Sequence, residues 1–268
     1  MRPDSPCIGG IFKSKYPADT IWVQSGTGAG AGTEGNPFYW NEYSEAFLAA
    51  AQSSSNQIVF KDGQYVWTSA ILQDDNVGNN ITMIAENTHQ AIFTDNGWRI
   101  NSAGKNPTLR LKGIQLIAVD HFTLGGECHY VFDSCHVLSH KYIGSLSVTA
   151  KGSIFEIPAG VATYSFNVGE TVYTDIKNSI FADHNDRQSA HNYLTQGING
   201  VFKNCIFYSK YPRTNCISTS SAVLENCASE NITNPEDGVV FNENLGFLDI
   251  DNKNYKLRPS SVLISRGK

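Results

Sequence analysis

Side chains that could carry out acid–base chemistry gather between residues 140 and 213 of this chain. One reaction open to them is removal of a proton beside a carboxylate, which needs a base and also cations that stabilise the resulting enolate. Histidine, lysine and arginine can supply both parts. The residues predicted for these catalytic roles are Lys210, Arg187, His184 and Arg213.

Further polar and aromatic residues of the same stretch are candidates for substrate binding. They are His140, Lys141, Tyr142, Asp183, Asp186, His191 and Tyr211. Two carboxylates several ångströms apart would serve glycoside hydrolysis instead, and Asp183 with Asp186 is the nearest pair in the sequence. Aromatic rings can also stack on sugar faces. A third interpretation makes the whole set solvated loop residues, and the three stay open.

Metal and cofactor sites have weak signals. Asp249 and Asp251 resemble the start of a calcium loop, but Lys253 occupies the third ligand position, which favours a simple turn. The six cysteines lack the C-x2-C spacing of metal sites, so we expect mostly buried thiols. No cofactor and no metal ion is expected.

Composition excludes several classes of protein. The chain has 268 residues and a formal net charge of −5, and no stretch approaches the roughly 18 apolar residues of a membrane-spanning helix. Nucleic acid is not expected as a partner, because binding phosphates requires a basic surface. Ile, Val, Phe and Tyr occur throughout, which argues against disorder.

A short block that repeats every 18 to 26 residues organises most of the chain. Repeats of this length with one strand pattern each are typical of solenoids. The aligned blocks predict an interior column, a turn column that suits left-handed backbone, and a third column of Cys and Ser. The interior column is Leu111, Phe132, Ile176, Phe202 and Leu224, and the turn column is Asn87, Gly113, Ser134, Gly152, Asn178, Asn204 and Asn226. The asparagines are expected to form a ladder from coil to coil.

These features resemble the right-handed parallel β-helix proteins of the pectate-lyase-like superfamily. The resemblance rests on the strand at 20–23 with its Gly-rich continuation, an amphipathic helix at about 41–52, the strand at 58–65 and the Asn-bearing coils. It implies an all-β, right-handed parallel β-helix solenoid of about 7–8 coils. The helix would cap the N-terminal end, with Asn41 capping its first turn.

The same resemblance divides the chain into segments. Residues 19–268 would form the β-helix domain, with coils at about 56–240 and a closing segment at about 245–268. Residues 1–18 look like the end of a preceding module, because 2–10 are similar to 258–266. The chain is therefore predicted to be one unit of a tandem array.

Functional expectations also follow from the resemblance, since β-helix proteins of this kind lay substrates along the outer face of the stack. The first expectation is a module of a phage tail fibre, tailspike or cell-surface protein that contacts an extended polysaccharide. A polysaccharide lyase acting on an acidic, uronate-containing glycan is the second, and a purely structural spacer is the third. An extracellular or virion-surface location is implied, with a homotrimer or neighbouring modules as possible assemblies.

Overall fold

A computed structural model describes most of the chain. The residues that it describes are 7–8, 11–12, 20–66, 80–95, 107–118, 128–138, 147–159, 166–167, 173–185, 193–196, 199–218 and 222–264. Within these ranges, no helix is both long and apolar enough to cross a membrane.

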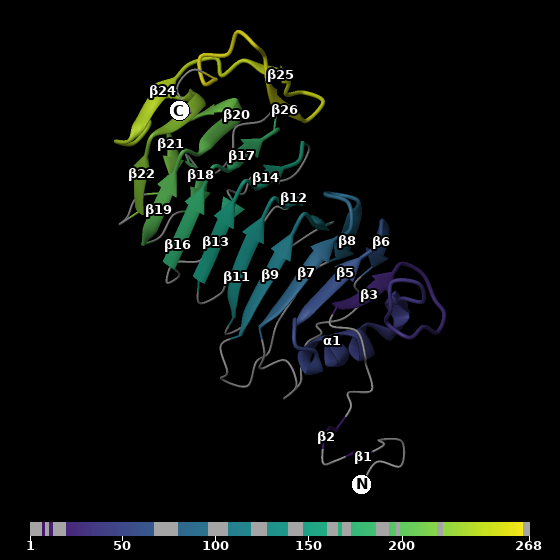
Figure 1. Cartoon of the computed structure of the whole chain (residues 1–268). Coiled ribbons are helices and arrows are strands. Elements are labelled where there is room, and N and C mark those ends of the chain that lie inside the picture. Colours follow the sequence, from purple (N-terminus) through teal and green to yellow (C-terminus); the bar gives the residue numbers. More distant parts are fainter. Residues whose placement is uncertain are drawn as a thin grey trace.

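Two long parallel sheets dominate the architecture, and their strands alternate along the chain (Figure 1). The ten-stranded sheet consists, in order, of β22 (Ala222–Glu225), β19 (Gly200–Lys203), β16 (Tyr173–Lys177), β13 (Ser147–Lys151), β11 (His129–Asp133), β9 (Thr108–Lys112), β7 (Ile81–Ala85), β5 (Gln57–Phe60), β3 (Thr20–Gln24) and β4 (Phe38–Tyr39). The nine-stranded sheet consists of β24 (Val239–Asn242), β23 (Cys227–Ile232), β20 (Ile206–Arg213), β17 (Ile180–Asp183), β14 (Ile154–Ile157), β12 (His136–Leu138), β10 (Gln115–Ala118), β8 (Ala91–Asp95) and β6 (Gly63–Val66).

Each coil contributes one strand to each long sheet, from β5 and β6 through β22 and β23, which makes eight strand pairs. A third, three-stranded sheet contains β15 (Phe166–Asn167), β18 (Tyr193–Gln196) and β21 (Asn215–Ile217). The prediction of an all-β parallel β-helix solenoid is therefore confirmed.

The coil interior follows the predicted columns. All five members of the interior column are at most 4% exposed. Beside them, the rings of Phe155, Phe181 and Phe207 stack with centroids 5.0 and 5.3 Å apart. Because the strands pair in register, equivalent side chains of successive coils lie directly over one another inside the solenoid.

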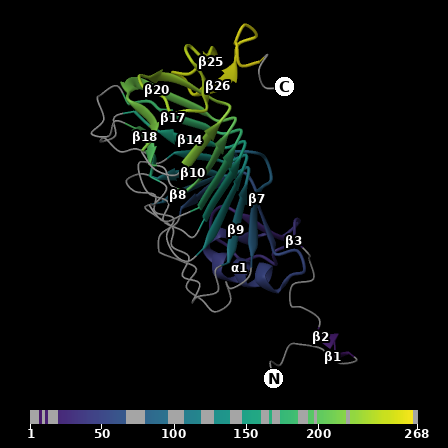
Figure 2. The same ribbon diagram turned by 90° about the vertical axis from the view of Figure 1, so that its left-hand side faces the viewer.

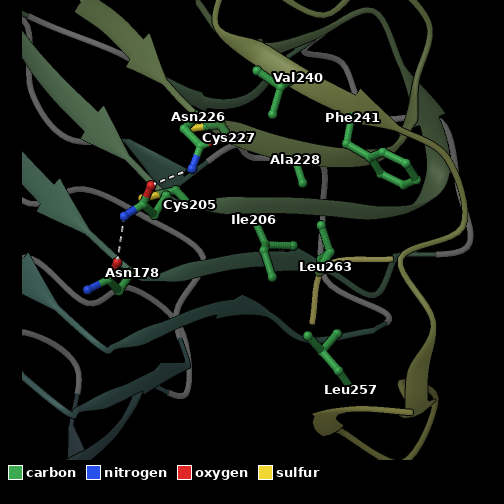
Figure 3. A pocket seen from close by; sticks show the side chains of 11 residues that line it. Asn178, Cys205, Ile206, Asn226, Cys227, Ala228, Val240, Phe241, Leu257 and Leu263 are labelled. Atoms are coloured by element: carbon green, nitrogen blue, oxygen red, sulfur yellow. Dashed lines mark hydrogen bonds between the residues drawn. The ribbon is translucent and has the colours of Figure 1, made fainter. Parts of the chain in front are cut away.

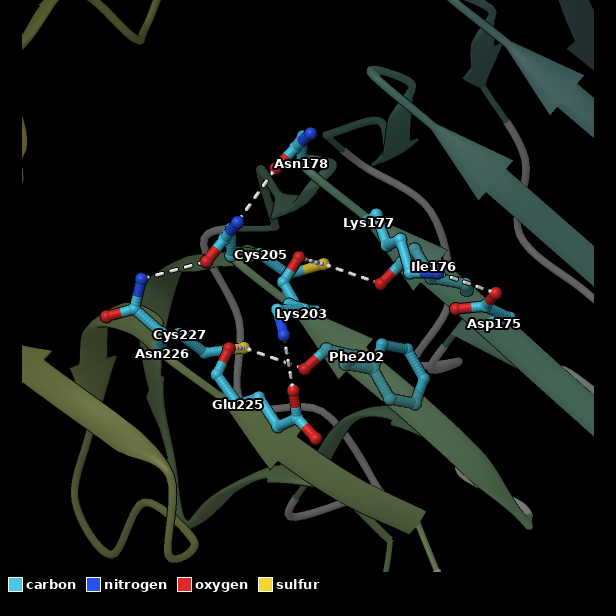
Figure 4. Close-up of polar contacts among 11 residues, drawn as sticks. Asp175, Ile176, Lys177, Asn178, Phe202, Lys203, Cys205, Glu225, Asn226 and Cys227 are labelled. Carbon is cyan, nitrogen blue, oxygen red and sulfur yellow. Dashed lines mark hydrogen bonds and ion pairs between the residues drawn. The ribbon is translucent and has the colours of Figure 1, made fainter. Parts of the chain in front are cut away.

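The turn between the two long sheets contains the predicted asparagine ladder. Asn178, Asn204 and Asn226 have φ between 49° and 52°. The side-chain amide of Asn204 donates to that of Asn178 at 3.1 Å, and the amide of Asn226 donates to that of Asn204 at 2.8 Å (Figure 4). Asparagine suits this turn because it tolerates left-handed backbone and bonds locally. Asn87 was wrongly included in this column, since the left-handed residue of its turn is His89.

The cysteine column is also confirmed. Cys135, Cys205 and Cys227 are buried free thiols, and their Sγ atoms donate to carbonyls of the preceding coil at 3.2–3.4 Å. Burial raises the pKa of Cys135 to about 12, so this thiol stays protonated and unreactive.

The helix α1 (Tyr43–Gln52) packs against β3, β4 and β5 at the N-terminal end of the stack (Figure 1). Its apolar side chains cover interior residues of the first coil. Asn41 does not cap this helix as predicted. Its amide instead bonds both the N–H and the carbonyl of Gly28, at 2.9 and 3.2 Å, and so ties the Gly-rich run to the helix start.

The two ends of the chain are small hairpins. The strands β1 (Cys7–Ile8) and β2 (Ile11–Phe12) pair at the N-terminus, and the rest of the predicted joint segment, 1–18, lies outside the described residues. At the other end, β25 (Phe247–Asp249) and β26 (Asn254–Leu257) form an antiparallel hairpin, which we call the closing hairpin. Figure 2 shows it beside the last coils of the nine-stranded sheet.

Candidate functional site

Two of the predicted site residues meet inside the protein as an ion pair. Arg213 is 4% exposed and Asp183 is 1% exposed. The Nε and Nη2 groups of Arg213 both donate to Oδ2 of Asp183, the first at 2.9 Å, and Nη1 donates to the carbonyl of Tyr193 at 2.5 Å. Asn185 donates to the other oxygen of Asp183 at 2.9 Å. These contacts join β17, β18 and β20 and direct both charges away from solvent.

An irregularity of β20 explains why Arg213 points inward. The pairing of β20 with β23 shifts register between Tyr208 and Arg213. Such an irregularity re-aims the side chains that follow it. The sequence alignment, which assumed a solvent-facing loop at this position, contained no signal for that shift.

His184 is buried as well, beneath the closing hairpin. It is 5% exposed, and its Nε2 lies 2.7 Å from the hydroxyl of Tyr255. The Tyr255 hydroxyl donates to Glu156 at 2.9 Å, so its oxygen is left as the acceptor and Nε2 of His184 carries the proton. Burial lowers the pKa of His184 below its ordinary value of 6.5, which keeps the imidazole neutral.

Glu156 is the centre of this arrangement, although no motif in the sequence indicated such a role. Its carboxylate is fully buried and accepts from Nε2 of His136 and from Tyr255, both at 2.9 Å, while Nζ of Lys253 lies 2.5 Å from its other oxygen. Although burial raises the pKa of a carboxyl group, the hydrogen bonds from His136 and Lys253 outweigh that effect and lower the pKa of Glu156 to about 2. We call His136, Glu156, His184, Lys253 and Tyr255 the Glu156 cluster.

The cluster lies where the closing hairpin covers the outer face of the nine-stranded sheet. Ile180 and Ile206 point outward from that sheet and are covered by apolar side chains of the closing segment, among them Phe247, Leu257 and Leu263. The Ile-Phe pair that recurs at 154–155, 180–181 and 206–207 was the available signal. Two apolar neighbours in a strand occupy opposite faces, so their presence indicates a strand that is covered on both sides.

The chemistry of the Glu156 cluster suits it to holding the closing hairpin in place. A carboxyl with a pKa near 2 stays ionised and is a weak base, and every polar contact described for it comes from the sheet or the hairpin. Charge-assisted hydrogen bonds of this kind are strong in a buried place. The cluster therefore fastens the hairpin to the stack.

Two other predicted site residues lie on the surface of the nine-stranded sheet. Lys210 and Tyr211 are exposed on β20, and Tyr211 is 37% exposed. The remaining ones lie outside the described residues, and their roles stay predictions; they are His140, Lys141, Tyr142, Asp186, Arg187 and His191.

A small groove runs beside the asparagine ladder, between the outer face of the nine-stranded sheet and the closing segment (Figure 3). Its volume is about 240 Å³, and its walls are mostly apolar side chains such as Ile206, Phe241 and Leu263. It contains no charged side chain. Among the residues that the structure describes, no three His, Cys, Asp or Glu side chains are placed so that they could hold a metal ion.

The outer face of the ten-stranded sheet presents charged side chains in register. Lys112, Lys151, Lys177 and Lys203 lie at one position of their strands, and we call them the lysine column. Asp133 lies between the first two, and Glu225 follows the last one. Nζ of Lys177 is 2.9 Å from Asp175, and Nζ of Lys203 is 2.9 Å from Glu225 (Figure 4). All four lysines are exposed.

Comparison of the chain with models of known families, with curated proteins and with solved structures finds no match. The stacked parallel sheets support a β-helix solenoid directly.

Proposed function

We propose that this chain is a β-helix module that contacts an extended polysaccharide along its outer surface. The observation that carries the proposal is the ten-stranded sheet, whose strands pair in register from β3 to β22. At a spacing of about 4.8 Å per strand, its face extends roughly 40 Å along the stack, which suits an extended polymer better than a compact ligand.

The contacts of the predicted catalytic groups favour binding over catalysis. Arg213 is held by Asp183 inside the protein, and His184 is held by Tyr255 beneath the closing hairpin. A lyase needs a base and a cation that reach the substrate. Of the four groups predicted for this reaction, Lys210 is the one on the described surface, so the lyase remains the less supported alternative.

The setting of the module is proposed from the sequence resemblance. A tail fibre, tailspike or cell-surface protein would place it at an extracellular or virion surface, where extended glycans are met. The similarity of residues 2–10 to 258–266 adds the proposal that several such modules follow one another in one array.

A panel of polysaccharides tests this function, with retention in affinity electrophoresis and ultraviolet absorbance of unsaturated products as readouts. We expect retention by at least one polymer without product formation. Product that disappears in Lys210→Ala but persists in the exposed control Lys256→Ala would establish the lyase instead. If no polymer retains the protein and no product forms, the structural spacer is the function that remains.

A further inference from the structure

The lysine column is a costly arrangement for a sheet. Lys151, Lys177 and Lys203 lie directly opposite one another on neighbouring strands. Like charges in direct cross-strand pairs destabilise a sheet. The ammonium groups repeat along the stack every 4.8 Å or so, so the three span about 10 Å.

Neighbouring acidic groups compensate this charge only in part. Lys177 and Lys203 each have an acidic partner at 2.9 Å, but both pairs are well exposed, and exposed pairs contribute little. Among the described residues, Lys112 and Lys151 make no ion pair. The column thus keeps a local excess of positive charge.

The sign of this surface is opposite to that of the whole chain. Arg110 is also exposed and lies two residues before Lys112 on the same strand. With it, this part of the face has five basic side chains and three acidic ones, which are Asp133, Asp175 and Glu225. The chain as a whole carries a net charge of −5. A positive strip on an acidic protein directs an anionic ligand to that strip.

We infer that the lysine column is a binding strip for an anionic polysaccharide whose chain runs along the stack axis. The inference rests on the proposed polysaccharide-contacting function and adds the ligand's charge, the face that binds it and its direction. A polymer with acidic groups at regular intervals meets several ammonium groups at once, whereas a single small anion would meet one. Carboxylate and sulfate groups share this chemistry.

The shape of the face favours a glycan over nucleic acid. The lysine column is one side chain wide, and the acidic groups beside it would oppose a duplex that needs many phosphate contacts. An extended single sugar chain can follow Lys151, Lys177 and Lys203, which are consecutive in the column, with Asp133 and Glu225 at the two ends of that run.

Affinity electrophoresis with matched polymers tests the inference. The probes are dextran sulfate against dextran, and polygalacturonate against its methyl ester, so each anionic polymer has a neutral counterpart with the same backbone. Single-stranded DNA serves as a polyanion of another class. We expect retention by one or both anionic glycans, not by the neutral ones, and weaker retention as salt increases.

Two variants of equal net charge locate the site. Lys151→Gln/Lys177→Gln removes two positive charges from the column, and Lys256→Glu changes the net charge equally on the closing hairpin. We expect about ten-fold weaker binding for the first and a change within about two-fold for the second.

Each other outcome overturns a defined part of the inference. Equal binding by both variants would show that the lysine column is not the binding site, but it would not contradict the proposed function. Equal retention by charged and neutral polymers would remove the requirement for charge, and tighter binding of DNA would remove the glycan as ligand. A wild-type protein that no polysaccharide in the wider panel retains would refute the proposed function itself.

Discussion

The two long sheets of the solenoid share every coil, yet their outer faces differ completely. In the last coils, the nine-stranded sheet presents Ile180 and Ile206, and the closing hairpin covers it there. The ten-stranded sheet presents Lys177 and Lys203, which remain exposed. Glu156, Asp183 and Arg213 of the nine-stranded sheet are buried and held by several partners, whereas Lys177 and Lys203 on the open sheet each form one exposed pair.

This difference shows that the two outer faces of one β-helix can have different environments, which depend on the residue types on either side of a single turn. The block from Lys177 to Phe181 contains both patterns, with an outward lysine before the turn and an outward isoleucine after it. Alternating polar and apolar residues leave a strand face open, and two consecutive apolar residues indicate a covered one.

The largest expected effect comes from breaking the buried pair between Asp183 and Arg213. Asp183→Asn leaves an uncompensated guanidinium inside the protein, and we expect a loss of about 3–5 kcal/mol in the free energy of unfolding. Urea denaturation measures it. Asp175→Asn is the matched control on the open face and should change the midpoint little. Equal losses in the two variants would contradict the contrast between the faces.

Removing the charge of Glu156 should release the closing hairpin with a smaller loss of stability. Glu156→Gln weakens the contacts to His136, Lys253 and Tyr255, and we expect a loss of about 2–3 kcal/mol. Hydrogen exchange at residues 247–257 should accelerate much more than exchange in the ten-stranded sheet. Uniform acceleration along the stack would show that the cluster does not act on the hairpin.

Acid should loosen the same hairpin by a smaller amount. The pKa of His184 lies below 6.5 in the folded protein, so its contribution is complete above pH 6.5 and declines as the unfolded chain takes up a proton below that value. The pKa of Glu156 is lowered from 4.5 to about 2, so its contribution is lost as pH falls through that window. Hydrogen exchange between pH 7 and pH 4 measures the His184 part, and its extension to pH 2 measures the Glu156 part, which Glu156→Gln should abolish.

The smallest expected effect belongs to the open face. Glu225→Gln removes the partner of Lys203, and we expect a change within about 1 kcal/mol, because both groups are nearly half exposed. The same urea titration checks it. A loss as large as that of Asp183→Asn would show that the open face stabilises the stack as strongly as the covered one.

Local repeats were sufficient to predict the coil. The spacing of the blocks predicted stacked coils with one strand pattern each, and residue type identified the asparagine turn and the cysteine column. These predictions succeeded because each depends on contacts between one coil and the next, which recur with the repeat. The prediction of a left-handed turn at Asn87 was wrong, and it lies where the repeated block is weakest. The prediction of a helix cap at Asn41 was wrong because the Gly-rich run competes for its amide.

The site residues were harder to predict because their partners are far apart in sequence. Arg213 lies 30 residues from Asp183, and Tyr255 lies 99 residues from Glu156. The first contact depends on an irregular strand and the second on the docking of a terminal hairpin. Neither has a periodic signal.

By itself, the sequence determined the repeated coil, its filled interior and the residue types on each outer face, because side-chain alternation and turn preferences act locally. The tertiary structure decided which face is covered, which charges are buried and which remain available to a ligand. The physical reason is that burial of a charge depends on what packs over it. On the nine-stranded sheet that covering segment comes from the far end of the chain, while the face of the ten-stranded sheet that carries the lysine column stays exposed.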